Sequence, residues 1–274
     1  MLTIASLTLR EMLRKRILLI IAVLTVAFLV LYSLALRLAA RDLVRLDNPL
    51  VRFAISSQML SAGLYLSSFI VAFLAIFSAV GAVSGEAENG TLHAIVPKPL
   101  PRRDIVLGKY LGYGAVLAIY AALLFAAVVA AARYFLATPT RSEFPALALF
   151  VLEPLLLLAL TLYGTTVMST LANGVTLGTL FVVGLIGGMV EQVGTLVQSQ
   201  SLVNIGIVTS LIMPADAIYR KVAVVLFGDS PLSAFKIGPY SPGSTPSVWM
   251  VAYAVLYLLA ALGLAVRAFD RRDI

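Results

Sequence analysis

The sequence predicts an all-α integral membrane protein with six transmembrane helices, an N-terminal interfacial amphipathic helix, and short outer re-entrant helices between helices five and six. Apolar residues make up 61% of its 274 residues, above the roughly 45–50% of soluble domains. Charged residues make up only 12%, against about 25% in soluble domains. Six apolar stretches are each about 20 residues long, which is the length that crosses a bilayer. We therefore expect a single transmembrane domain over residues 1–274.

The first 16 residues are predicted to form an amphipathic helix in the membrane interface. Leu2, Ala5, Leu9 and Leu13 recur near helical spacing, and most of the charged residues lie on other sides of such a helix. The alternative interpretation is an ordinary charged flank that fixes orientation. Both interpretations place this end on the cytoplasmic side. We also expect the first apolar stretch to be retained and not cleaved as a signal peptide.

Six spans follow from the apolar stretches and from the charges that bound them. Arg16 and Arg37 flank the first span, and Arg267 closes the last. Between the fourth span and the fifth, residues 171–173 leave only a tight turn, so these two spans are predicted to be adjacent and antiparallel. Six crossings return the C-terminus to the cytoplasmic side. The predicted spans cover about residues 17–36, 59–83, 111–136, 146–168, 174–197 and 248–266.

The outer region between the fifth and sixth spans covers residues 198–245 and is too long for a simple turn. Its first apolar run ends at Pro214 after about a dozen residues, a length that favours a re-entrant or interfacial helix. Residues 215–227 are predicted to form a second short helix. Asp216 would cap this helix, and Arg220 and Lys221 would lie on its polar side. The remainder reads as a turn-rich loop.

The residue types exclude several kinds of chemistry. The sequence has no cysteine and one histidine, which removes thiolate nucleophiles and histidine or cysteine metal clusters. It also lacks the GxxxxGK[ST] motif that holds nucleotide phosphates. The net charge of +7 comes from basic residues at the ends of apolar stretches, so it predicts membrane anchoring and no binding of nucleic acid. We therefore expect neither an enzyme nor a cofactor or metal site in this chain.

Glu153 and Glu191 are the charged residues predicted to lie well inside spans. An ionised carboxylate at mid-depth costs about 2.5–3.5 kcal/mol on the insertion scale, so Glu153 should face protein or water. Glu153 could belong to a substrate pathway or to helix packing, or it could pair with a basic residue such as Arg133. Pro154 follows it and predicts a local break in the fourth helix. For Glu191, near the end of the fifth span, a solvated position is the favoured interpretation.

Residues 84–110 form a charged, proline-broken segment between two long apolar stretches, so they must lie at a membrane face. Gly90 predicts a turn, and residues 91–96 could form a helical turn or two. The prolines at positions 97, 99 and 101 forbid its continuation. A new helix is predicted to begin near Asp104. A short rigid helix between turns suits a cytosolic loop that transmits force between a partner and the spans.

This segment resembles that of permeases in the type-2 ATP-binding-cassette (ABC) exporter family. The matching pattern is G-E, E, GTL, P-x-x-R and I-L-x-G-K, and the last span also ends in an F-x-R-R-D pattern at residues 269–273. Residues 213–220 resemble an N-P-x-D-x-Y-R stretch of some members, among them the nitrous-oxide-reductase maturation permeases, with Met213 in place of asparagine. The matching residues of the segment are Gly85, Glu86, Glu88, Gly90, Thr91, Leu92, Pro99, Arg102, Arg103, Ile105, Val106, Leu107, Gly108 and Lys109.

The resemblance implies a permease subunit of the cytoplasmic (inner) membrane that pairs with a second copy of itself. Two copies of a separate ABC ATPase subunit, which would carry ATP and Mg, would power export of an amphiphilic or hydrophobic molecule by alternating access. Membrane lipid and an accessory protein are further expected partners. The resemblance places ATPase docking on Glu86, Glu88, Gly90, Thr91, Leu92 and His93, with Arg10 and Arg14, and the substrate pathway on Phe69, Phe73, Phe77, Val183 and Met189. Glu153 is a further pathway candidate because of its predicted depth in the fourth span.

The alternative function is a stand-alone, ion-coupled secondary transporter that uses Glu153 and Glu191. Such a transporter would need no ATPase. The sequence shows no internal repeat of the kind that many secondary transporters contain, and this argues against the alternative.

Overall fold

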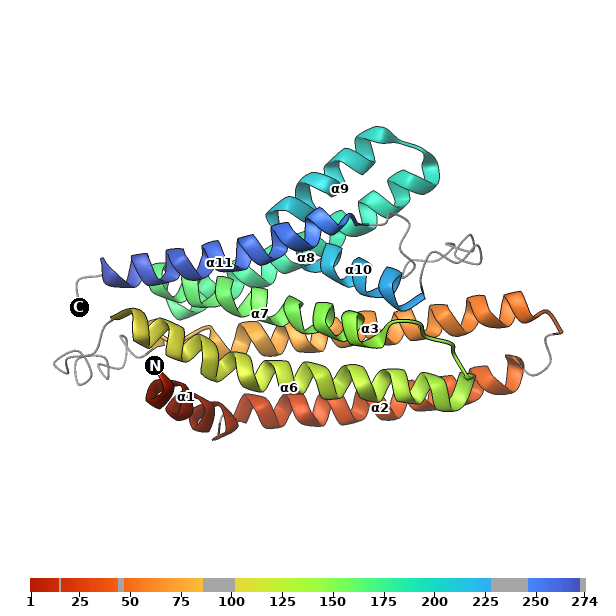
Figure 1. Cartoon of the computed structure of the whole chain (residues 1–274), viewed down its shortest axis with the longest axis horizontal. Coiled ribbons are helices and arrows are strands. Elements are labelled where there is room, and N and C mark those ends of the chain that lie inside the picture. The colour runs from red at the N-terminus through yellow and green to blue at the C-terminus, as the bar shows by residue number, and fades with distance from the viewer. Residues whose placement is uncertain (15, 44–46, 86–101, 228–245, 272–274) are drawn as a thin grey trace.

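The computed structural model describes residues 1–14, 16–43, 47–85, 102–227 and 246–271, and in these ranges the chain forms helices and no strand (Figure 1). Six of the helices are long and apolar enough to cross a membrane, which confirms the predicted all-α membrane fold. The helices are α1 (Leu2–Arg14), α2 (Arg16–Leu43), α3 (Pro49–Ala79), α6 (Arg102–Leu136), α7 (Glu143–Val167), α8 (Thr170–Val197), α9 (Gln200–Ile212), α10 (Ala215–Phe227) and α11 (Val248–Asp270).

The long helices run side by side along the long axis of the molecule (Figure 1). α3 is the most enclosed of the six, because 72% of its most apolar 18-residue stretch is buried. α2 lies at the periphery, because only 11% of the corresponding stretch is buried. α7 packs against α3, α6, α10 and α11, so α3 and α7 form the centre of the bundle. The N-terminus, the end of α3, the beginning of α6 and the end of α11 lie at one end, which we call the N-terminal end of the bundle.

Local sequence explains where several helices begin. Asn48 caps α3 by accepting a hydrogen bond from the Leu50 amide at 2.9 Å, and Pro49 occupies the first turn, where its missing N–H is not needed. Ser169 caps α8 by accepting from the Ala172 amide at 3.5 Å. The predicted turn at 171–173 is therefore placed too late, because α8 already begins at Thr170.

The predicted break at Pro154 is wrong, because α7 runs through this proline from Glu143 to Val167. Proline removes one backbone hydrogen bond, but packed membrane helices tolerate this loss when neighbouring groups satisfy the freed carbonyl. Glu153, Pro154 and Phe150 are all buried among other helices. Tertiary packing thus keeps this helix continuous.

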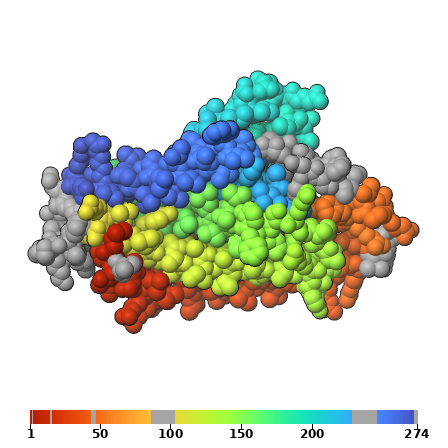
Figure 2. Space-filling view, in the orientation of Figure 1, coloured from red at the N-terminus to blue at the C-terminus, as the bar shows by residue number. Residues whose placement is uncertain are grey.

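The chain between the fifth and sixth apolar helices contains two short helices joined by a sharp bend. α9 and α10 meet at Met213 and Pro214 with an angle of 105° between them, as in a broken span or a re-entrant loop. α9 packs along the second half of α8, and this pair projects from the bundle in Figure 2, whereas α10 packs against α7. The bend therefore brings α10 into the bundle.

The first helix, α1, packs along the beginning of α6. Thr8 and Met12 are buried there, whereas Arg10 and Arg14 are exposed. Gly112 of α6 permits the contact, because a Cβ at this position would lie 2.7 Å from the Ala5 carbonyl oxygen. The predicted helix is present, and its place in the membrane interface stays a prediction.

Alanine at Gly112 is therefore expected to weaken the packing of α1 and to destabilise the protein by about 1–3 kcal/mol, the usual range for overpacking. Gly263 of α11 offers a matched control, because a Cβ there would meet no atom within 4 Å. Gly263→Ala should be neutral or stabilise the helix by up to about 1 kcal/mol. Heat-induced aggregation of the two purified variants in detergent measures the difference, and equal midpoints would contradict the expected clash.

Candidate functional site

The proposed docking residues fall into two groups in the structure. Glu86, Glu88, Gly90, Thr91, Leu92 and His93 lie outside the described residues. Arg10 and Arg14 are exposed on α1, at the same end of the bundle where α3 ends and α6 begins (Figure 1). The structure describes the chain up to residue 85 and again from residue 102, and the contacts of these flanking residues show how the chain on either side of the segment is held.

The turn after α3 is held by hydroxyl groups of two other helices. The amides of Val83 and Ser84 donate to Oγ1 of Thr165 in α7, at 3.3 and 3.0 Å. The Ser84 hydroxyl lies 2.9 Å from Thr165 Oγ1 and 2.8 Å from Oγ1 of Thr170, at the start of α8. These contacts attach residues 83 and 84 to the turn between α7 and α8.

The carbonyl groups of the same turn are satisfied from α6 and α8. Nζ of Lys109 donates to the Ala82 carbonyl at 2.5 Å, and Nδ2 of Asn173 donates to the Val80 carbonyl at 3.1 Å. The last carbonyls of a helix have no partner within it, and a cation is favoured near this end of the helix dipole. Lys109 and Asn173 are both buried, so they supply partners that water does not provide there.

We call this set the junction: residues 80–85 with Lys109, Thr165, Thr170 and Asn173. It joins residues 80–84, close to the end of the range described before position 86, to α6, α7 and α8. The sequence pattern pointed to Lys109 only as part of a motif, and the hydroxyl and amide partners were missed. Serine and threonine are common in membrane helices, so no local signal marks the ones that cap another helix.

The pathway candidates do not form one cluster. Phe69 and Phe73 of α3 pack edge-on against Phe181 of α8, and Phe77 stacks on Phe73. Phe73 and Phe77 are 39% and 44% exposed, so α3 presents an aromatic strip on the surface of the single chain. Val183 and Met189 are exposed on α8. Val183 is two positions from Phe181, which places it on nearly the opposite side of the helix.

Glu153, the sixth pathway candidate, lies in the core of the bundle with 2% of its surface exposed. It is near Ser68 of α3 and Asp216 of α10, so it faces protein, as expected of a carboxylate at this depth. The suggested partner Arg133 forms an ion pair with Glu143 instead, at 2.5 Å. Glu153 is therefore separated from the exposed candidates on α3 and α8.

A buried ionic cluster joins α10 to α8 and α9. Nη2 of Arg220 lies 2.8 Å from Glu191 Oε2 and 3.2 Å from Ser210 Oγ, and Nε lies 2.9 Å from Asp216 Oδ2. Arg220 and Asp216 are each 2% exposed. We call these four residues the ionic cluster. Its formation requires glycine nearby, because a Cβ on Gly188 would overlap the Asp216 carboxylate.

Two expectations from the sequence are wrong at this cluster. Glu191 is not at a solvated helix end, because it is 7% exposed and paired with Arg220. Arg220 is not on a solvent-facing polar side of its helix, because α10 is enclosed by α7 and α8. Asp216 and Arg220 are four residues apart, a spacing typical of ion pairs on one helix, and this signal could have been found.

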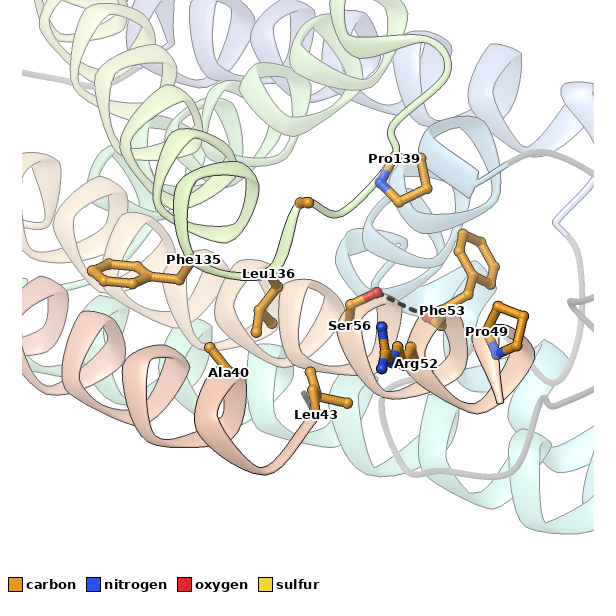
Figure 3. Close-up of a pocket in the computed structure, with 10 residues that line it drawn as sticks. Ala40, Leu43, Pro49, Arg52, Phe53, Ser56, Phe135, Leu136 and Pro139 are labelled. Atoms are coloured by element: carbon orange, nitrogen blue, oxygen red, sulfur yellow. Dashed lines mark hydrogen bonds between the residues drawn. The ribbon is translucent and has the colours of Figure 1, made fainter. Parts of the chain in front are cut away.

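A pocket of about 370 Å³ lies at the opposite end of the bundle, between the ends of α2 and α6 and the start of α3 (Figure 3). Its lining is mainly apolar. Arg52 and Ser56 lie side by side in it, and the Ser56 hydroxyl donates to the Phe53 carbonyl at 3.0 Å. None of the sequence-predicted site residues lines this pocket. Among the described residues, no three histidine, cysteine or acidic side chains gather as metal ligands would.

Comparisons with known proteins agree on one kind of protein. The sequence matches the family described as "ABC-2 family transporter protein" over residues 2–274. It is 29% identical over 218 residues to the "Probable ABC transporter permease protein NosY" of Stutzerimonas stutzeri. The aligned region covers 76% of this chain and 78% of that protein. A protein of the same name from Pseudomonas aeruginosa is 41% identical over 54 residues, or 20% of each chain.

Proposed function

Because the chain belongs to the ABC-2 family of transporter proteins and is a permease subunit with six apolar helices, we propose that a separate ATPase subunit drives it. Two copies of the chain and two copies of the ATPase would export an amphiphilic or hydrophobic molecule by alternating access. The sequence has no phosphate-binding loop, so ATP and Mg would bind to the partner. The protein would lie in the cytoplasmic membrane with both termini on the cytoplasmic side.

Docking of the ATPase is proposed for residues 86–93, together with Arg10 and Arg14 of α1. The observation that supports this proposal most strongly is the junction, because it attaches the chain that leads into this segment to α6, α7 and α8. A force applied to the segment would then reach the spans. α1 packs beside α6 at the same end, so its exposed arginines are available to the same partner.

The second copy of the chain and the cargo would meet exposed apolar residues of α3 and of α8. Phe73, Phe77, Val183 and Met189 are each about two-fifths exposed although they are apolar, which suits a surface that faces lipid, cargo or another subunit. The contact between Glu191 and Arg220 argues against the alternative of an ion-coupled carrier, because that carboxylate is engaged in a buried ion pair.

Affinity purification of the tagged chain from its native membranes tests this function. We expect an ATP-hydrolysing subunit to copurify, and native mass spectrometry to give two copies of each chain. A permease that purifies alone, while transport by its vesicles continues without ATP, would contradict the proposal and favour the ion-coupled carrier.

A further inference from the structure

Contacts between distant parts of the chain hold the turn that ends α3. The junction's bonds from Lys109, Thr165, Thr170 and Asn173 join residues that are at least 27 positions apart. They reach residues 80–84 from three different helices. The turn is thus fixed to the three helices around it.

On the basis of the function proposed above, we infer that the junction passes a displacement of the docking segment to α7 and α8, and that Thr165 and Asn173 are positioning residues for transport. Neither residue needs to touch the ATPase or the cargo for this role. They act by keeping the end of α3 in a fixed position relative to the turn between α7 and α8.

Burial makes this connection stiff. Thr165 and Asn173 have no exposed surface, Ser84 is 2% exposed and Lys109 is 4% exposed. If residues 80–85 moved away from α7 and α8, backbone amides and carbonyls would lose their partners in a place that water does not reach. Leaving buried backbone groups without hydrogen-bond partners costs a large free energy. The end of α3, the start of α6 and the turn between α7 and α8 therefore move as one body.

Close packing at two glycines supports the same conclusion independently. A Cβ on Gly164 of α7 would overlap the Asn173 amide group, and a Cβ on Gly81 would lie 3.1 Å from Thr170 Cγ2. The Asn173 amide also donates to the Thr161 carbonyl at 3.0 Å, so one side chain joins α7, α8 and the end of α3. Packing and hydrogen bonds thus both resist slippage between these elements.

The junction leads to the helix that carries two of the pathway candidates. Thr170 and Asn173 belong to the first turn of α8, and the exposed Val183 and Met189 follow along the same helix. A tilt or rotation imposed at the first turn would change what these side chains face. The junction therefore links the docking segment to the surface proposed for cargo and for the second copy.

Single-cysteine labelling of the complex with its ATPase tests this inference. The chain has no cysteine of its own, and Ile186 of α8 is 54% exposed, so Ile186→Cys provides a unique reporter site. The rate of maleimide labelling is compared with and without ATP in lipid nanodiscs. Thr165→Val removes the hydroxyl at nearly constant volume, whereas Thr165→Ser retains it.

Thr161→Val is the matched control, because Thr161 is equally buried in α7 but its hydroxyl donates within its own helix, to the Leu157 carbonyl at 2.7 Å. We expect ATP to change the labelling rate in the unaltered protein, in Thr165→Ser and in Thr161→Val. In Thr165→Val, the ATP-dependent change should be at least about fivefold smaller, as loss of a typical coupling energy implies, while the ATPase stays bound.

A full ATP-dependent change in Thr165→Val would overturn the inference, and so would an equal loss in Thr161→Val. An ATP-independent labelling rate in the unaltered complex would also overturn the inference. If Thr165→Val does not assemble, Ser84→Ala removes the hydroxyl contacts from the other side and is judged by the same criteria. Failure of the unaltered chain to bind an ATPase would instead overturn the proposed function, before any junction variant is compared.

Discussion

Replacing Arg220 with methionine is expected to destabilise the protein by about 3–5 kcal/mol, the range for breaking a buried ion pair by removing one partner. Methionine fills much of the same space but leaves the carboxylates of Glu191 and Asp216 without their cation. α10 would then lose its hold on α8 and α9. The fraction of protein that stays soluble after heating in detergent measures the effect.

Two comparison variants separate lost charge pairing from lost volume. Lys221→Met alters the neighbouring cation, which is partly exposed and donates to the Pro246 carbonyl, so it should cost about 1 kcal/mol or less. Adding Glu191→Gln to Arg220→Met should recover part of the stability, because it removes one of the uncompensated charges. Equal heat resistance of Arg220→Met and the unaltered protein would show that the ionic cluster contributes little.

Charge reversal at Glu86 and Glu88 together is expected to reduce the amount of bound ATPase by at least about tenfold, which corresponds to about 1.4 kcal/mol of binding free energy. These residues are proposed to contact the ATPase, and lysine in their place would put like charges against the partner surface that they meet. The chain itself should stay folded. Quantitative copurification of the ATPase, with the permease yield as reference, gives the ratio.

The matched control for this variant is Asp47→Lys, which reverses an exposed acidic residue just before α3, and α3 begins at the opposite end of the bundle. It should leave ATPase binding unchanged.

A proline at Leu92 should uncouple ATP hydrolysis from transport by breaking the predicted short helix. Normal ATPase binding and normal coupling in these docking variants would remove residues 86–93 from the docking site.

The six spans could be predicted because crossing a bilayer imposes a strict requirement on length and composition. A stretch such as residues 17–36 shows this requirement locally, and α2 follows it from Arg16 to Leu43. The break at Pro154 was predicted from a local rule that tertiary packing overrides. The two short helices between the fifth and sixth spans could be predicted because the apolar run before Pro214 is too short to be a full span, and their place on the outer side stays a prediction.

The contacts between helices could not be predicted in the same way. Arg220 was assigned to a polar side of α10, because the sequence of this helix taken alone gives no sign that α7 and α8 enclose the helix. Thr165 and Asn173 gave no signal either, because their partners are backbone groups about 80 to 90 residues away in the sequence. A single sequence shows which groups need partners when buried, but the fold decides which groups meet.

Photocrosslinking from position 92 tests the central claim, that a separate ATPase docks on this chain, most directly. A photoreactive amino acid replaces Leu92, and in a second protein it replaces Trp249, which is 82% exposed at the start of α11. After irradiation of intact cells, we predict a crosslinked product between position 92 and an ATPase subunit, and no such product from position 249. Crosslinks from position 92 only to lipid or to other copies of this chain, or equal ATPase crosslinks from both positions, would contradict the account.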